Sequence, residues 1–346
     1  MFDCNKEIKA FHDEKVTLTA NDRTDMRGRR DSGRVRLDKG LGRDGHALPS
    51  CHSQGSYAMH TMVQDDTYDY DIDDGAYFKR KDLQGDGGRD LTPDEAKKRV
   101  CSALNQDDRL AYDAEIHDNC VRQRYPKGYH IDIPVYRINA GEDDDGNSIE
   151  WYELASSKGW VKSDAREVTR WFTRAVSDAG DDNGRQLRHV VRLTKAFARS
   201  RPEWKEETAS GILLTTLVQG EFVAVPGRDD ESLRTTLQRI SKRLANSLIV
   251  GHPVNDGNLS DANDKKATFF RDKLKDALKT LEILDGNPTR SEARKAWDDV
   301  FNTSFFSKQP TPKSGSDGGG DAVKGSMFIV DETKSDRRND GNGSYG

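Results

Sequence analysis

Three aspartates in two short segments have the types and spacing of a phosphoryl-transfer site. Asp71 and Asp73 alternate with Ile72, and successive side chains of a β-strand point to opposite faces. The two carboxylates therefore share one face of a predicted strand, while Ile72 points into the core. Asp132 stands in the string His-Ile-Asp-Ile-Pro, which predicts a second strand with one buried and one polar face. Together the three aspartates would form one carboxylate cluster.

Such a cluster suits two divalent cations. Mg²⁺ is a hard cation that takes oxygen ligands, and two ions roughly 3.5–4 Å apart hold the attacking and leaving oxygens of an in-line displacement. The sequence therefore predicts two Mg²⁺ ions, with Mn²⁺ as the alternative, bound by Asp71, Asp73 and Asp132. The expected chemistry is transfer of a phosphoryl group, with these three acids as the catalytic residues.

A Gly-Ser step precedes the acidic pair. Gly55 allows the backbone to approach a ligand closely, and Ser56 adds a hydroxyl and an amide N–H. A turn here could hold the terminal phosphates of a nucleoside triphosphate. Gln54 and Tyr57 flank the step and complete the predicted nucleotide-binding segment.

Three strings of the sequence resemble those of one bacterial enzyme family. They are Gln-Gly-Ser-Tyr at 54–57, Asp-Ile-Asp-Asp-Gly at 71–75 and His-Ile-Asp-Ile-Pro at 130–134. The set is similar to the motifs of the DncV-like cyclic GMP-AMP synthases, within the cGAS/DncV-like nucleotidyltransferases (CD-NTases) of CBASS antiphage defence. Further similar segments extend the resemblance to roughly residues 50–306.

The resemblance implies a fold and two more site residues. The fold is α+β of the polymerase-β-like nucleotidyltransferase type, with a mixed-sheet lobe packed against a helical C-terminal lobe and the active site in the cleft between them. The family places a triphosphate-binding lysine on the helix predicted at 185–200 and a serine at the start of the next helix, which match Lys195 and Ser210. From the residues alone, a second interpretation stays open for Lys195. It also belongs to the basic face of this helix, which could simply be exposed to solvent.

The resemblance also implies substrates and a product. In this family a ribose hydroxyl attacks the α-phosphate of a bound triphosphate, and a second transfer closes a ring. The DncV branch implies ATP and GTP as substrates, 3′,3′-cyclic GMP-AMP as the second messenger, and an effector, such as a phospholipase or nuclease, that the product activates. Spacing identifies no base-reading residue, and Arg124, Asp256 and Asp261 are the candidates.

Two other functions are compatible with the motifs. One is a template-independent nucleotidyltransferase that makes linear products, and the other is a non-catalytic nucleotide-binding sensor whose carboxylates bind a structural metal. The net charge of -5 and the pI near 6.0 argue against a nucleic-acid partner, since binding to a phosphate backbone needs clustered basic charge. The Asp-x-Asp pair with a third Asp argues against the sensor.

The chain divides into three predicted regions. These are an N-terminal helix with the catalytic lobe at 1–158, a helical lobe at 159–307, and a flexible Gly- and Ser-rich tail at 308–346. Within the catalytic lobe we expect a helical stretch at 92–124 and a hairpin turn at 141–150. No apolar run approaches the ~18 residues of a membrane span, and no signal-peptide core is present. The sequence therefore predicts a cytoplasmic protein without a membrane partner.

Gly346 is a predicted conjugation site. A small terminal residue on a flexible tail can enter a narrow enzyme channel, and many relatives encoded beside ubiquitin-like E1 and E2 enzymes end in a small residue that is joined to other proteins. The resemblance thus implies ubiquitin-like E1/E2 partners, with an ordinary disordered end as the alternative.

The cysteines and histidines are not expected in the site. The four cysteines have no C-x-x-C spacing, so free thiols are expected. The histidines at 117, 130, 189 and 252 lack metal-ligand spacing to one another. Each is expected to be structural or exposed.

Overall fold

The computed structural model describes residues 1–65, 70–107 and 109–310. Met1–Gln309 form one unit of the chain. Nearly all of the predicted tail, including Gly346, lies outside the described residues. Within the described part, no helix is both long and apolar enough to cross a membrane.

A mixed sheet holds the predicted aspartates. Its strand order is β3-β4-β5-β2-β6-β7-β8, with β1 paired to β2. β2 pairs antiparallel with β1 and parallel with β5 and then β6, and the remaining pairs are antiparallel. The strands are β1 (Ser50–Gln54), β2 (Asp71–Lys79), β3 (Glu115–Ile116), β4 (Val121–Arg124), β5 (His130–Ile133), β6 (Val135–Glu142), β7 (Ser148–Ser156) and β8 (Gly159–Lys162).

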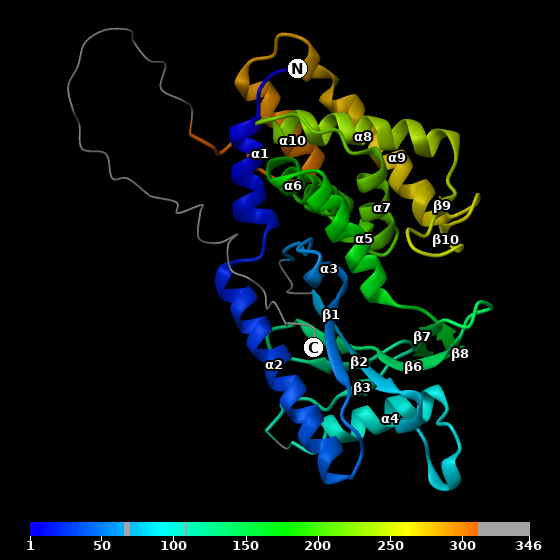
Figure 1. Cartoon of the computed structure of the whole chain (residues 1–346). Helices are drawn as coiled ribbons and strands as arrows, with labels where there is room; N and C mark the ends of the chain where they lie inside the picture. The colour runs from blue at the N-terminus through cyan, green and yellow to red at the C-terminus, as the bar shows by residue number, and fades with distance from the viewer. Residues whose placement is uncertain (66–69, 108, 311–346) are drawn as a thin grey trace. The chain divides into compact units, whose positions relative to one another are not determined.

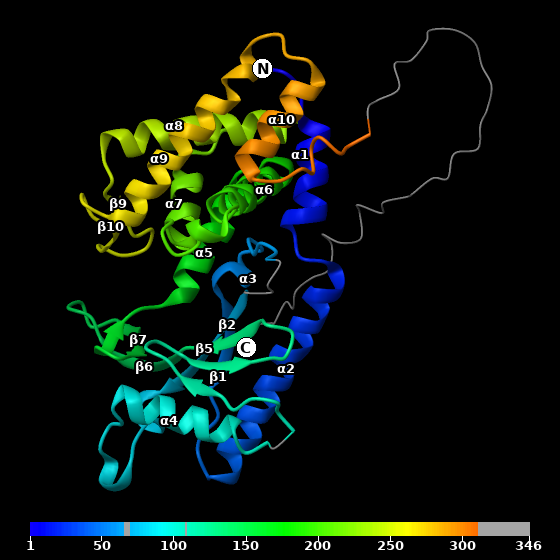
Figure 2. The ribbon, with the colours of Figure 1, turned by 180° about the vertical axis from the view of Figure 1, so that it is seen from behind.

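The two faces of the sheet are those that the alternation predicted. Ile72, Ile131 and Ile133 are buried in one hydrophobic core. The aspartates between them point to the other face, because neighbouring residues of a strand point in opposite directions. Both views in Figures 1 and 2 place α4 on one side of the sheet and α3 with the helices α5 to α10 on the other.

Two helices cover the apolar face of the sheet. They are α2 (Ala20–Arg43) and α4 (Pro93–Leu104), which supply Leu37, Leu41 and Val100 to the core. α4 begins as predicted, with a capping box in which the Thr92 side chain accepts from the backbone N–H of Glu95.

The predicted helical stretch at 92–124 is wrong beyond Leu104. Residues 121–124 form β4, where Val121 and Gln123 are buried and the arginines between and after them point to the other face. This is a two-residue period, and pairing with β5 stabilises it. The hairpin turn expected at 141–150 is tighter: β6 runs to Glu142 and β7 starts at Ser148.

A second hydrophobic core joins the C-terminal helices. Figure 1 shows them grouped together, with α1 among them. Phe11 of α1 contacts Phe301 and Phe306, with ring centroids 4.7 and 4.8 Å apart. The helices are α1 (Asn5–Phe11), α5 (Ala165–Asp178), α6 (Asp181–Ala198), α7 (Gly211–Glu221), α8 (Asp229–Asn246), α9 (Lys265–Thr280) and α10 (Arg290–Phe301).

Several short elements complete the described chain. A π-helix spans His12–Val16, between α1 and α2, and α3 (Gly55–Ala58) follows β1 directly. β9 (Val250–Gly251) and β10 (Asn258–Ser260) form a separate two-stranded sheet. Short 3₁₀ helices lie at Arg80–Asp82, Asp86–Gly88, Pro202–Trp204 and Leu281–Asp285. The four cysteines are free thiols, as predicted.

Candidate active site

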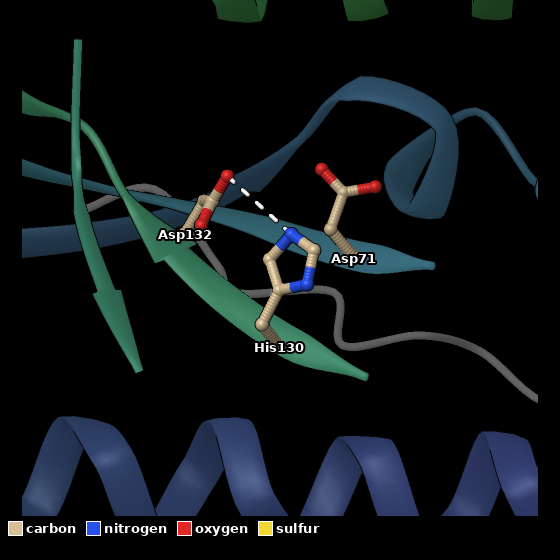
Figure 3. A group of neighbouring side chains, drawn as sticks. All are labelled: Asp71, His130 and Asp132. Atoms are coloured by element: carbon tan, nitrogen blue, oxygen red, sulfur yellow. Dashed lines mark ion pairs between the residues drawn. The ribbon is translucent and has the colours of Figure 1, made fainter. Parts of the chain in front are cut away.

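The register of β2 and β5 arranges four polar side chains as two cross-strand pairs. Asp71 is opposite His130, and Asp73 is opposite Asp132. Residues directly opposite on adjacent strands point to the same face. Figure 3 shows His130 and Asp132 rising from β5 beside Asp71 of β2. Ligand atoms of these three residues all lie within 4.8 Å of one another.

In the described part of the chain, neither Asp71 nor Asp73 forms an ion pair with a lysine or an arginine, although the charge of Arg122 acts on both from a distance. Burial, and then the charge of Asp132, raise the pKa of Asp71. Burial, and then the charges of Asp71 and Asp132, raise the pKa of Asp73 well above its usual range. A cluster of hard oxygen donors with unbalanced negative charge fits a divalent cation.

Asp132 differs because an arginine holds it. Arg122 of β4 lies opposite Asp132 and donates Nε to Oδ1 and Nη2 to Oδ2, both at 2.7 Å. His130 Nε2 is 3.8 Å from Oδ2. Asp132 is 7% exposed. The third carboxylate is therefore oriented by side chains of its own strand and of the adjacent strand.

Sequence reasoning missed both Arg122 and His130 as residues of this face. Arg122 fell inside the stretch predicted to be helical, although its alternation with Val121 and Gln123 was a strand signal. His130 was compared with other histidines and not with Asp132, two residues further along the same strand. That i, i+2 spacing was the available signal.

The Gly-Ser turn touches the second aspartate. Gly55 has φ +64°, a conformation that glycine adopts without the steric cost of a side chain. A Cβ at this position would lie only 2.2 Å from Oδ2 of Asp73. The turn therefore packs its backbone directly against the carboxylate, and Ser56 follows at the start of α3.

Gly55→Ala is expected to lower turnover roughly 100-fold, since displacing a reacting group by about 1 Å has that effect. The methyl group would push the Asp73 carboxylate away and would add about 1–2 kcal/mol of left-handed backbone strain. Gly45→Ala is the matched control, because Gly45 has φ +71° and a Cβ there would meet nothing within 4 Å. Thermal melts should show similar destabilisation in both variants. Steady-state kinetics should show the loss of turnover in Gly55→Ala only. Equal activities would contradict the contact's role.

Lys195 of α6 lies deep in the protein. Its side chain is 5% exposed, and Nζ donates to the carbonyl oxygen and Oγ1 of Thr61 at 3.2 and 3.1 Å. Burial, followed by the charges of Arg199 and Arg192, lowers its pKa to about 7. The amine is thus easily deprotonated and would gain from an anionic ligand.

One cavity brings most of the predicted residues together. It has a volume of about 390 Å³. Its lining includes Gly55, Ser56, Asp71, Asp73, Lys195 and Gly211. Ser210 itself is exposed at the N-cap of α7, where its Oγ accepts from the Leu213 N–H; its neighbour Gly211 reaches the cavity.

The side chains of Gln54 and Tyr57 form hydrogen bonds with other protein residues. Gln54 is 2% exposed; its Oε1 accepts from Tyr77 at 3.0 Å and its Nε2 donates to Tyr136 at 3.3 Å. The hydroxyl of Tyr57 accepts from Arg30 at 3.3 Å. Their predicted role in nucleotide binding stays a prediction, and for Gln54 the backbone is the part next to the Gly-Ser turn.

A second and larger cavity is lined by one of the three aspartates and by residues of α4 and of the loop before β4. Its volume is about 950 Å³, and Asp132, Arg122 and Cys120 line it. Asp71 and Asp73 line the first cavity and Asp132 the second. The carboxylate cluster therefore contributes side chains to both cavities.

The three base-reading candidates line neither of these cavities. Arg124 lies opposite His130, and its Nε is 3.7 Å from Glu115. Asp256 and Asp261 are exposed, in the loop before β10 and immediately after it. Nothing in the geometry singles them out.

Comparison with known proteins finds a family model that matches the part of the chain carrying these aspartates. Residues 49–136 match the family model described as "Cyclic GMP-AMP synthase DncV-like, nucleotidyltransferase domain". A curated protein named cyclic GMP-AMP synthase, from Escherichia albertii, is 27% identical over 235 residues, which are 66% of this chain and 49% of that protein. The chain thus spans about half the length of this curated relative.

Solved structures share the fold. Vibrio cholerae DncV in complex with the linear intermediate pppA(3′,5′)pG has a TM-score of 0.67 at 17% identity, covering 87% of this chain and 96% of that one. Escherichia coli MS115-1 CdnC with ATP has a TM-score of 0.63 at 18% identity, covering 87% and 98%. The predicted α+β nucleotidyltransferase fold is confirmed. Residues 49–136 match the DncV-like nucleotidyltransferase domain, and the rest of the chain shares the fold of the solved DncV and CdnC structures.

Proposed function

We propose that this enzyme is a cyclic dinucleotide synthase that makes 3′,3′-cyclic GMP-AMP from ATP and GTP as an antiphage signal. One observation carries the proposal: the three aspartates contribute to the lining of two cavities, and the Gly-Ser turn and Lys195 line the smaller one. Such an arrangement has room for two nucleotides whose reacting atoms meet at the acids. The matched family model and the curated relative's name support the product.

The smaller cavity is the proposed site of the donor triphosphate. The hydroxyl and N–H of Ser56 would donate to phosphate oxygens, and the amine of Lys195 would pair with them. Negative charge at this position favours the protonated amine, so binding of a triphosphate would raise the pKa of Lys195 from its value of about 7.

The carboxylates are the proposed ligands of divalent cations. Asp71, Asp73 and Asp132 would hold two Mg²⁺ or Mn²⁺ ions, which when bound stabilise the charge on the transferred phosphoryl group. Asp132, which lines the larger cavity, would accept the proton of the attacking ribose hydroxyl. Arg122, which holds that carboxylate, keeps it oriented toward the neighbouring acids.

Ring closure requires a second transfer at the same acids. In this proposal the linear dinucleotide turns within the two cavities and presents its other hydroxyl. The structurally similar Vibrio cholerae protein was crystallised in complex with a linear intermediate, pppA(3′,5′)pG, which supports a stepwise route here.

Mass spectrometry of the products tests the function. We expect the purified protein, incubated with all four nucleoside triphosphates and Mg²⁺, to release a cyclic dinucleotide containing one adenine and one guanine. The Asp71→Asn variant is the control and should release none. Linear oligomers would instead favour the template-independent nucleotidyltransferase, and the absence of any product would favour the sensor.

Two partner proposals follow from the same assignment. A cyclic product needs an effector that it activates, such as a phospholipase. Conjugation of Gly346 by ubiquitin-like E1 and E2 enzymes is the second; it rests on the sequence and the family resemblance, because this residue lies outside the described part of the chain.

A further inference from the structure

We propose that His130 is a nitrogen ligand of the divalent cation held by Asp71 and Asp132, and that it makes this site favour Mn²⁺ over Mg²⁺. The inference rests on the proposed metal-dependent function. It concerns a residue that lies outside the three-aspartate motif.

The position of His130 is determined by two strands and not by a loop. It lies opposite Asp71 in the parallel register of β2 and β5, and two residues before Asp132 on β5. Its side chain is therefore on the same face as both carboxylates. His130 is 7% exposed, so its ring is held within the protein and cannot turn freely into solvent. Figure 3 shows the ring beside the space between the two aspartates.

The ligand atoms of Asp71, His130 and Asp132 are close enough to one another to bind a single ion. His130 Nε2 is 3.8 Å from Asp132 Oδ2, and ligand atoms of all three residues lie within 4.8 Å of one another. Two ligands on opposite sides of an ion at about 2.1 Å are about 4.2 Å apart. Small side-chain rotations would therefore bring all three onto one cation without moving either strand.

Neither of the two nearby arginines pairs with Asp71 in the described residues, so neither takes the position of a metal ion. Arg124 lies opposite His130 on the other side, but its Nε is 3.7 Å from Glu115 and its side chain is 48% exposed. Arg122 holds Asp132 and forms no ion pair with Asp71 in the described residues. Across the β2–β5 pair, Asp71 faces the imidazole of His130.

An imidazole ligand changes which metal binds best. Mg²⁺ prefers oxygen ligands and gives up its water reluctantly, so a nitrogen donor adds little to its affinity. First-row transition ions accept nitrogen as well as oxygen, and their affinities for such sites increase from Mn²⁺ along the series. An Asp-His-Asp set should therefore select Mn²⁺ more strongly than three aspartates would.

Metal binding without nucleotide tests the inference. Dissociation constants for Mn²⁺ and for Mg²⁺ would be measured by calorimetry on the full chain and on His130→Asn. We expect the variant to bind Mn²⁺ about 10-fold more weakly and Mg²⁺ within about 3-fold of the wild type. His117→Asn is the matched control, because His117 is a half-exposed histidine of the same lobe, and it should change neither constant.

A histidine that only positions Asp132 would give a different pattern. Both metals would then weaken equally in His130→Asn, and that result, like no change in either, would overturn the inference. If the variant fails to fold by circular dichroism, pulsed electron paramagnetic resonance of Mn²⁺ on the wild-type protein decides the question. Modulation from a directly bound ¹⁴N nucleus is expected, and its absence would equally overturn the inference.

Failure of the inference is distinguishable from failure of the proposed function. Mn²⁺ bound without nitrogen coupling would remove His130 from the ligand set and leave the synthase proposal intact. A wild-type protein that binds neither Mn²⁺ nor Mg²⁺ and releases no dinucleotide would overturn both.

Discussion

Asp73→Asn is expected to lower the rate of dinucleotide formation by roughly 10³-fold and at the same time to raise the melting temperature of the metal-free protein. Activity falls because an amide is a poorer metal ligand and cannot balance a divalent charge. Stability rises because the substitution removes one of three crowded carboxylates. Kinetics with Mg²⁺ and thermal melts in the presence of a chelator would measure the two effects.

The stability gain should depend on pH. Burial and the charges of Asp71 and Asp132 raise the pKa of Asp73 above its unfolded value, so the folded state binds the proton more tightly. Wild-type stability is then greatest at low pH and falls as pH rises through the raised pKa. The melting-temperature difference between Asp73→Asn and the wild type is therefore expected to be larger at pH 8 than at pH 5.

An exposed aspartate provides the control for this prediction. Asp144 lies in the turn between β6 and β7, and Asp144→Asn makes the same change in charge and should leave both activity and stability unaltered. Wild-type turnover in Asp73→Asn would refute its assignment as a catalytic metal ligand. An unchanged melting temperature would refute the repulsion among the carboxylates.

Lys195→Met should separate function from stability in the same way. Loss of the ammonium group is expected to weaken ATP binding by about 100-fold, since a buried, charge-assisted contact of about 2.7 kcal/mol is removed. The free energy of unfolding should increase by roughly 2 kcal/mol at pH 6, because burying the charge opposes folding more than its bonds to Thr61 favour it. Equilibrium binding of ATP and urea denaturation measure these effects.

The sign of the pH dependence follows from the lowered pKa. The folded-state pKa of Lys195 is about 7, against 10.5 for the ordinary side chain. The unfolded state therefore binds more protons between these values, and wild-type stability rises with pH across this window. The advantage of Lys195→Met should shrink from pH 7 toward pH 10. Lys275→Met, at an exposed position within α9, should show no such trend, and a pH-independent difference for Lys195→Met would contradict the explanation.

Local patterns in the sequence were sufficient to place the three aspartates. Side-chain alternation in a strand is a property of the backbone, so the shared face of Asp71 and Asp73 could be predicted without tertiary information. The same holds for Asp132 and the two isoleucines around it, which the structure buries. The start of α4 was equally local, because its capping box involves only residues 92–95.

Contacts between residues far apart in the sequence were harder to predict. Lys195 reaches Thr61 across more than a hundred residues, and only the family resemblance pointed to it. The pairing of Asp71 with His130 depends on strand register, which sequence alone leaves open. β4 contains only four residues, and so short an alternation is stabilised by its partner strand more than by its own propensity.

The contact of Phe11 with Phe301 and Phe306 has a consequence for biosynthesis. These rings join residues nearly three hundred positions apart, so α1 emerges from the ribosome long before the helices that cover it. Until those helices are made, Ile8 and Phe11, both buried in the finished core, stay exposed to chaperones and to other nascent chains. The helical core can close only after residues 290–306 have been synthesised, which makes its completion a high-contact-order step.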